Sequence, residues 1–421
     1  MFNKTTLLNK TTLRISLVLF VLLMTSFQTA VAEDWGRFRG PRADGTTADS
    51  KIPTTWSDKE NVKWKLALPG GGFSSPIVVG KQVLVTAYSE SGNGVKRHLV
   101  SVDRATGKAQ WTKSIEGVSD GGGQGFSYHG QASHTPVSDG ERVYVMFGSS
   151  GVIAYDLAGE QLWKKDVGNE RRARFGTAAS PILHGDLLIV AAGSESESIR
   201  AFNKKTGEEV WKTEAGSLSQ SYSTPLIAKN AKGGEDLLIS VAYEVWSMNP
   251  ATGKLKWYAE TQVDTAACPA IIAKDGVAYV IGGRSGGRAA IRIDGKDDVT
   301  DSSVLWSERG GSYVPSPVLH NGRLFWINDR GVASCVDTKT GKEVGQKRIS
   351  GRFYSSVLLA GDKLYAVSRF GGTYVLKATP KFEQIALNKL TDESDFSGSP
   401  AVSDGQLFIR SDTNLYCIAA E

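Results

Sequence analysis

The sequence predicts an all-β protein: an eight-bladed β-propeller of four-stranded antiparallel blades, with an N-terminal strand closing the last blade. Two observations carry this prediction. A ten-residue pattern returns along the chain, and a second pattern around proline returns in step with it. Repeats of roughly 40–50 residues that each hold four short β-rich runs are typical of propellers. No amphipathic helix pattern of useful length follows residue 32.

The proline pattern marks the start of each blade. A small or hydroxylated residue stands beside a proline that opens a β-rich run, as in SSPIVV at Pro76 and YSTPLI at Pro225, and Val357 fills the same slot without proline. Successive copies lie 40 to 60 residues apart, which gives eight units of about 45 residues. The last unit lacks its outermost strand, and NVKWKLAL at 61–68 is an unassigned strand of that kind. Pairing the two would close the ring and remove two exposed strand edges.

The ten-residue pattern reads VDRATGKAQW at 102–111, FNKKTGEEVW at 202–211 and MNPATGKLKW at 248–257. We expect its Thr-Gly pair to make a tight turn between the two outer strands of a blade, because glycine accepts a positive φ without steric cost. The tryptophan is a large apolar plate that can cover the turn of the neighbouring blade and bury roughly 200 Å². The residues assigned to this structural role are Gly107, Gly207, Gly253, Gly341, Trp64, Trp111, Trp163, Trp211, Trp257 and Trp306.

The first 32 residues read as a secretory signal peptide. Basic residues precede an apolar run at 15–24, and Ala-Val-Ala at 30–32 offers a cleavage site. Residues 33–60 then form an N-terminal extension, and residues 61–421 form the propeller. We expect a periplasmic or secreted protein with no transmembrane segment after cleavage. No cysteine stands near the cleavage site, so no lipid anchor is expected.

Charge and cysteine content exclude several classes of protein. Without the leader the chain carries 46 basic residues against 44 acidic ones, because the leader holds three basic residues and no acidic one. This balance gives no support for nucleic-acid binding, which needs a concentrated basic face. The three cysteines, Cys268, Cys335 and Cys417, are far apart in sequence, so neither a disulfide framework nor a CxxC metal site is expected. We expect a monomeric propeller.

The repeated decamer resembles the PQQ-type propeller repeat, whose hallmark is Ala-x-Asp-x-x-Thr-Gly-x-x-x-Trp. The resemblance covers about residues 61–421. Proteins that share this repeat include quinoprotein alcohol dehydrogenases and the BamB-type subunit of the outer-membrane protein assembly machine. The segment DWGRFRGP at 34–41 resembles the start of exported single-propeller bacterial proteins of the same group. The resemblance therefore implies either an interaction platform in the cell envelope or a quinone-dependent enzyme.

Catalytic signals are weak. The resemblance implies that a quinoprotein would use adjacent cysteines, a tryptophan floor, Ca²⁺ held by Glu and Asn, and an Asp base, and this chain has no adjacent cysteine pair. His129 and His134 in HGQASH are expected to be ordinary loop histidines, and DGKDDVTD at 294–301 lacks the spacing of a calcium loop. No catalytic residue and no metal ligand is assigned. PQQ with Ca²⁺, acting on alcohols or sugars, remains the alternative.

One face of the propeller collects aromatic and arginine side chains. Loops that lead into the first strand of a blade and loops that leave its second strand lie on the same face, and arginine follows the second strand in four consecutive blades, 5 to 8. Tyr, Trp and Arg often anchor interfaces, and Arg grips carboxylates. The expected ligand or partner face consists of Arg174, Phe175, Tyr222, Arg284, Tyr313, Arg330, Arg352, Tyr354, Arg369, Phe370 and Arg410.

These residues favour a non-catalytic scaffold that binds an envelope protein or peptide, or a small anionic or carbohydrate ligand. A purely structural role is the other interpretation. In that case the aromatic residues plug the channel and the arginines pair with Asp329, Asp395 and Asp412.

Overall fold

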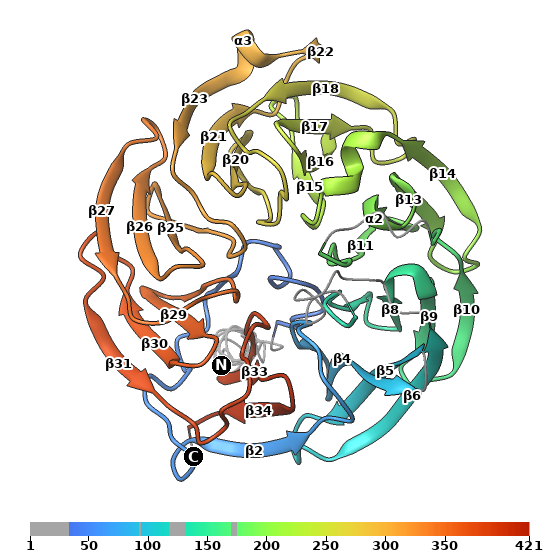
Figure 1. Cartoon of the computed structure of the whole chain (residues 1–421), viewed down its shortest axis with the longest axis vertical. Helices are drawn as coiled ribbons and strands as arrows, with labels where there is room; N and C mark the ends of the chain where they lie inside the picture. Colours follow the sequence, from blue (N-terminus) through green and yellow to red (C-terminus); the bar gives the residue numbers. More distant parts are fainter. Residues whose placement is uncertain (1–32, 92–93, 118–130, 170–174, 421) are drawn as a thin grey trace, which may run out of the picture. The chain divides into compact units, whose positions relative to one another are not determined.

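The computed structural model describes residues 33–91, 94–117, 131–169 and 175–420, and divides the chain into two units, 1–33 and 34–421. Within the second unit, eight antiparallel β-sheets follow one another around a central axis (Figure 1). Six sheets have four strands, and two have a fifth, because the short strands β1 (Thr46–Thr47) and β22 (Asp297–Asp298) add to blades 7 and 4 in parallel. The predicted all-β, eight-bladed fold is confirmed.

Each blade starts at the axis and ends at the rim. The strands of blades 1 to 4, from the axis outward, are β3 (Ile77–Val79), β4 (Gln82–Ser91), β5 (Gly94–Asp103), β6 (Ala109–Gly117); β7 (Val137–Ser138), β8 (Arg142–Met146), β9 (Val152–Asp156), β10 (Gln161–Lys165); β11 (Ile182–His184), β12 (Leu187–Ala192), β13 (Ser198–Asn203), β14 (Glu209–Glu214); β15 (Leu226–Lys229), β16 (Glu235–Val241), β17 (Glu244–Met248) and β18 (Leu255–Glu260).

The strands of blades 5 to 8, in the same order, are β19 (Ile272–Lys274), β20 (Val277–Gly282), β21 (Gly287–Arg292), β23 (Val304–Arg309); β24 (Val318–His320), β25 (Arg323–Ile327), β26 (Val332–Asp337), β27 (Glu343–Arg348); β28 (Leu358–Ala360), β29 (Lys363–Ser368), β30 (Gly372–Lys377), β31 (Gln384–Asn388); β32 (Ala401–Ser403), β33 (Gln406–Arg410), β34 (Asn414–Ile418) and β2 (Val62–Ala67). The described helices are single turns, η1 (Gly148–Ser150), α2 (Gly193–Ser196), η2 (Gly216–Gln220) and α3 (Thr300–Ser303). No described helix has the length and apolar content needed to cross a bilayer.

The N-terminal strand closes the ring. β2 is the outermost strand of blade 8 and pairs antiparallel with β34, with Trp64 opposite Cys417 and Leu66 opposite Leu415 (Figure 1). The strand predicted at 61–68 therefore lies beside the last strands of the chain. Each end of the chain supplies part of one sheet, and no blade of the ring is left with a missing outer strand.

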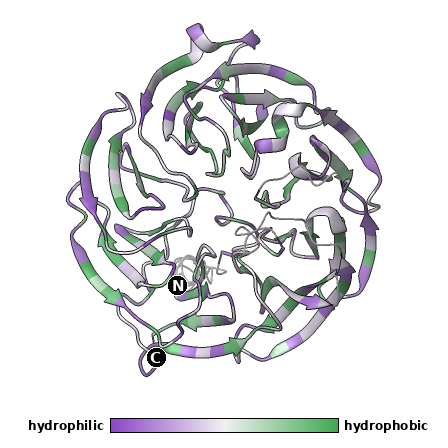
Figure 2. Cartoon of the chain, in the orientation of Figure 1, coloured by the Kyte–Doolittle hydropathy of each residue, from purple (hydrophilic) through white to green (hydrophobic). Residues whose placement is uncertain are grey.

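The hydrophobic core lies between successive blades. The second and third strands are mostly buried, and LLIVAA of β12 is buried along almost its whole length. The outermost strands instead alternate, as in EVWKTE of β14, so that one face packs inward and the other meets solvent. Figure 2 shows this alternation as bands of opposite hydropathy along the rim strands.

The repeat tryptophans join each rim strand to the next blade. Trp163 illustrates the contact, because its Nε1–H donates to the carbonyl oxygen of Lys204 at 3.1 Å. Its ring packs so closely on Gly207 that a Cβ added to this glycine would lie only 2.7 Å from the ring. Gly207 also has φ +73°, so both the turn and the ring require glycine here. The same hydrogen bond runs from Trp64 to Arg104, Trp111 to Leu157, Trp211 to Pro250 and Trp306 to Thr338.

Trp257 is the exception. It is fully buried, and its Nε1–H has no partner among the described residues. The next blade carries the insertion at 294–303, and β22 of this insertion pairs with β18, with Asp297 opposite Trp257. The insertion thus takes the place of the Thr-Gly turn that Trp257 was expected to cover.

The N-terminal extension runs along the innermost strands. Trp35 pairs with Val78 of blade 1, and the carbonyl oxygen of Gly36 accepts a hydrogen bond from the backbone of Ser138 in blade 2. Arg39 then donates to the carbonyl oxygen of Pro317 in blade 6. β1 pairs with β28 of blade 7, after which Trp56 packs beside Tyr365 with ring centroids 6.4 Å apart. The extension therefore crosses the interior of the ring.

Candidate functional site

Seven hydroxyl side chains form a collar around the axis of the ring. Each stands immediately before the innermost strand of its blade, and its oxygen accepts a backbone N–H from the preceding blade at 2.9–3.1 Å. These bonds fasten the blades to one another at the centre. The hydroxyl collar consists of Ser75, Thr135, Ser180, Thr224, Ser316, Ser356 and Ser399.

Blade 5 interrupts the collar. Its corresponding position is Ala270, which supplies the backbone N–H that reaches Ser316 at 2.9 Å but has no hydroxyl to accept one. Cys268, two residues earlier, donates through Sγ to the carbonyl oxygen of Ala266 at 3.3 Å. Burial raises the pKa of the Cys268 thiol to about 12, so the group is a neutral thiol at physiological pH. Cys268, Cys335 and Cys417 are all free.

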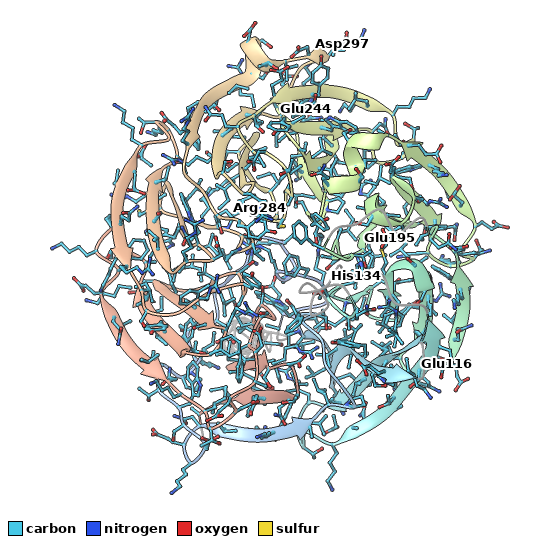
Figure 3. All side chains as sticks on the ribbon, viewed as in Figure 1. Glu116, His134, Glu195, Glu244, Arg284 and Asp297 are labelled. Carbon is cyan, nitrogen blue, oxygen red and sulfur yellow. The ribbon has the colours of Figure 1, made fainter. Side chains whose placement is uncertain are left out.

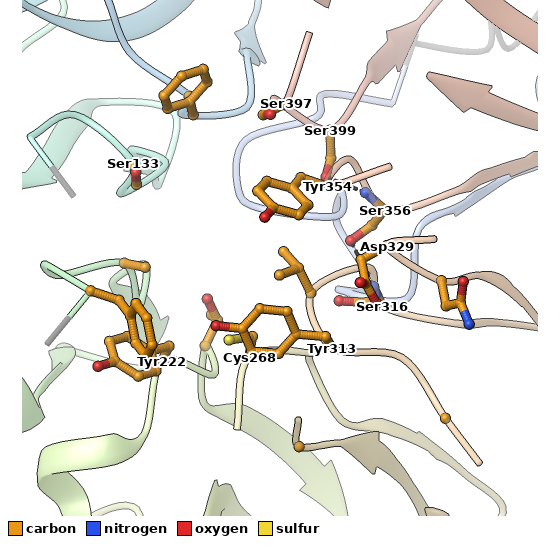
Figure 4. A pocket seen from close by; sticks show the side chains of 18 of the residues that line it. Ser133, Tyr222, Cys268, Tyr313, Ser316, Asp329, Tyr354, Ser356, Ser397 and Ser399 are labelled. Carbon is orange, nitrogen blue, oxygen red and sulfur yellow. Dashed lines mark hydrogen bonds between the residues drawn. The ribbon is translucent and has the colours of Figure 1, made fainter. Parts of the chain in front are cut away.

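A cavity of about 920 Å³ opens at the collar. All seven collar residues line it, together with Phe38 of the N-terminal extension and aromatic and arginine side chains. Figure 4 shows Tyr222, Tyr313 and Tyr354 from three different blades pointing into this space, with Cys268 next to Tyr313. Of the residues expected at the ligand face, the cavity is lined by Phe175, Tyr222, Arg284, Tyr313, Arg330, Arg352, Tyr354 and Arg369.

Arg284 is held between two aromatic rings. Its Cζ lies 5.6 Å from the ring centroid of Phe175 and 5.5 Å from that of Tyr313, distances that favour cation–π attraction. Figure 3 shows it near the centre of the ring. Glycines surround it because Gly283 and Gly286 flank it in sequence and also line the cavity, so a ligand can approach the backbone closely on this wall.

Two of the cavity arginines have carboxylate neighbours. Arg369 donates through Nε to Asp395 at 2.9 Å and stacks on Tyr354, with 4.4 Å from its Cζ to the ring centroid. Arg330 lies 4.0 Å from Asp329, and its side chain is 79% exposed. Both arginines thus have the carboxylate partners that a purely structural role predicts. Their position at the cavity does not by itself indicate a ligand.

Two described residues of the expected face, Arg410 and Phe370, do not line the cavity. Arg410 is fully buried and donates to the carbonyl oxygens of Thr86 at 2.7 Å and Ser411 at 3.1 Å. Burial lowers its pKa to about 10. Its assignment to a ligand-binding face was wrong, because its donors hold blade 8 against blade 1. Phe370 is 64% exposed and lies beside the cavity-lining Arg369, whose Cζ is 5.2 Å from its ring centroid. Arg174 lies outside the described residues.

Sequence reasoning missed the collar, Phe38 and the glycine wall. The signal for the collar was present, because a hydroxylated residue recurs beside the blade-opening proline, but it was used only to count blades. Phe38 belongs to an extension without a repeat pattern. The glycines at 282–287 belong to no repeat pattern either, and Gly286, with φ +77°, lies against Gly311 in the cavity wall.

The described residues do not bring together metal ligands. Among them, no three His, Cys, Asp or Glu side chains gather as a cation would require. His129 lies outside the described part of the chain. His134 is buried, and burial together with Arg97 lowers its pKa to about 3, so its imidazole is neutral.

Known proteins with the same fold span both functions implied by the repeat. Outer membrane protein assembly factor BamB of Burkholderia pseudomallei is 22% identical over 316 residues, covering 71% of this chain and 76% of that protein. The structure of BamB from Moraxella catarrhalis superposes with a TM-score of 0.62 at 14% identity, over 86% of this chain and 97% of that one. A europium-containing methanol dehydrogenase gives 0.65 at 11% identity, over 90% and 89%.

These two structural likenesses establish the fold alone. The sequence comparison goes further, because a family model matches three overlapping segments, 54–180, 121–220 and 159–380, which together span more than half of the chain. The chain therefore belongs to the family described as outer membrane protein assembly factor BamB.

Proposed function

We propose that this protein is a non-catalytic binding protein of the cell envelope, which holds part of a partner protein at the mouth of its central cavity. The observation that carries the proposal is the composition of the mouth, where arginine and tyrosine side chains from several blades converge on one space. Such residues supply most of the binding energy at protein interfaces. The family and the Burkholderia relative, both described as an outer membrane protein assembly factor, support a role in assembling envelope proteins.

A site-specific cross-linking experiment tests the proposal. A photoreactive phenylalanine analogue replaces Phe370, which is 64% exposed at the mouth, or Leu305, which is 47% exposed on the rim strand β23. Irradiation in intact envelopes should give a cross-linked partner of discrete mass from position 370 and not from position 305. Absence of any adduct at 370, or the same adducts at both positions, contradicts the proposal.

A quinoprotein oxidoreductase acting on alcohols or sugars is the second candidate. The observation in its favour is that four arginines and three tyrosines line one cavity, a setting that could accept a planar polycarboxylate such as PQQ. Calcium does not fit the described lining, because Ca²⁺ takes six to eight oxygen ligands, usually with several carboxylates, and Asp329 is the single carboxylate among the lining residues. Adding PQQ and Ca²⁺ to the purified protein tests this candidate, and quinone absorbance that co-elutes with the protein would favour it.

A further inference from the structure

The collar leaves hydrogen-bond donors unused. A serine or threonine hydroxyl has one donor and two acceptor positions. Each collar oxygen already accepts a backbone N–H, yet none of the seven O–H groups donates to another described residue. Since all seven residues line the cavity, its inner wall offers a ring of donors to a bound molecule.

Two of the arginines at the mouth have no carboxylate partner in the described part of the chain. Arg284 and Arg352 both line the cavity, and neither has a carboxylate within 4.0 Å among the described residues. Of the acidic groups near the mouth, Asp329 and Asp395 lie beside the other two arginines, and Asp264 accepts the backbone N–H of Ser285. The cavity therefore holds two guanidinium groups without a counter-ion among the described residues, and a guanidinium group has donors only.

The N-terminal extension lies at the inner end of the cavity. Val78 and Ser138, which bond to Trp35 and Gly36, each lie three residues beyond the collar residue of their blade. Phe38, two residues after Gly36, lines the cavity itself. The extension is therefore below the collar, on the side away from the arginine-lined mouth. This arrangement favours a polypeptide that binds by an end or by a projecting side chain over one that threads through the ring.

We infer that the cavity binds a carboxylate of the partner polypeptide, carried by a chain end or an acidic side chain that enters through the arginine-lined mouth. This inference rests on the proposed function and names the chemistry that the same site recognises. A carboxylate accepts about four hydrogen bonds and pairs with arginine in a bidentate fork, so it can pair with one of the two guanidinium groups and accept further hydrogen bonds from collar hydroxyls. A neutral amide can replace only part of these contacts.

Three N-acetylated, unlabelled pentapeptides test the inference by isothermal titration calorimetry with the purified protein, because a fluorescein label would add a carboxylate of its own. The first is Gly-Ser-Tyr-Gly-Ala with a free C-terminal carboxylate, the second is its C-terminal amide, and the third is that amide with Glu in place of the second Gly. We expect at least one carboxylate peptide to bind about tenfold or more tightly than the neutral amide. Preference for the first identifies a chain end as the source of the carboxylate, and preference for the third identifies an acidic side chain.

Matched variants locate the binding. Arg284→Gln combined with Arg352→Gln should abolish the preference for carboxylate peptides, whereas Arg323→Gln, an exposed arginine on β25, should leave it unchanged. Circular dichroism checks that all variants are folded. If the neutral amide binds as tightly as the acids, or if no peptide binds, the carboxylate inference is overturned, while a cross-link at Phe370 would still support partner capture. Peptide binding without any cross-link at Phe370 would instead count against the proposed function.

Discussion

Replacing Gly207 by alanine should destabilise the propeller more than replacing Gly185 in the same blade. Both glycines have positive φ, +73° and +56°. An alanine in this region costs about 1–2 kcal/mol. At Gly185 no described atom lies within 4 Å of the added Cβ, so the loss of stability should stay at that value.

At Gly207 the added Cβ would lie 2.7 Å from the ring of Trp163, which has to move. Moving it costs the hydrogen bond to the Lys204 carbonyl, about 1 kcal/mol, and part of the ring packing, about 1–2 kcal/mol. We therefore expect a total loss of about 3–5 kcal/mol for Gly207→Ala.

Urea unfolding followed by tryptophan fluorescence measures both variants. A double-mutant cycle with Trp163→Ala adds a stricter test, since removing the ring should reduce the effect of Gly207→Ala to the backbone cost alone. Equal losses for Gly185→Ala and Gly207→Ala, or a Gly207→Ala effect that is unchanged without the ring, would refute the role of the tryptophan–glycine contact.

Three further predictions concern buried polar groups. Arg410→Ala should lower the free energy of unfolding in urea by about 3–5 kcal/mol, because carbonyl oxygens between blades 8 and 1 lose their donors. Arg330→Ala at the exposed mouth should lower it by less than about 0.5 kcal/mol. Similar losses for the two variants would contradict the structural assignment of Arg410. Burial by itself raises the pKa of Asp392, but hydrogen bonds from Ser394 and neighbouring groups outweigh burial and hold the pKa below its usual value. The ionised Asp392 therefore stabilises the fold above about pH 4, and this contribution is lost as the pH falls further. Asp392→Asn should flatten the acid side of a curve of unfolding free energy against pH. Burial raises the pKa of Cys268 to about 12, so in a variant whose other two cysteines are serine, a disulfide reagent at pH 8 should react slowly with the native protein and at once in urea; fast native labelling would refute this.

The ring and its closure could be predicted from the sequence, because the number of repeats gives the number of blades and an incomplete repeat shows which strand is missing. Once eight units are counted and the last one lacks a strand, residues 61–68 have a single place to go, and β2 occupies it. The mouth could be predicted in part, since loop positions define a face. Side-chain direction could not: Arg410 ends β33 and turns between blades, whereas Arg369 lies just past the end of β29 and reaches the cavity.

Contacts between blades could not be predicted from the sequence, because they depend on how the blades are placed relative to one another. The collar bond from Ser75 to Thr135 joins residues that belong to different repeats, and only the relative position of the two blades brings them together. Phe38 lies in a segment without periodicity, so no pattern reported its path. The acidic segment at 294–301 is visible in the sequence, but the pairing of Asp297 and Asp298 with β18 depends on backbone groups rather than on residue type.

The shared eighth blade also constrains when the protein can finish folding. Trp64 is made more than 350 residues before Cys417, the residue it faces, so the first strand of the ring has to wait for the last. During synthesis, β2 and the side of blade 1 that it covers stay exposed, and an unpaired strand edge favours association with other chains. Such long-range pairing slows folding, which makes the unclosed ring the species that a chaperone would need to protect.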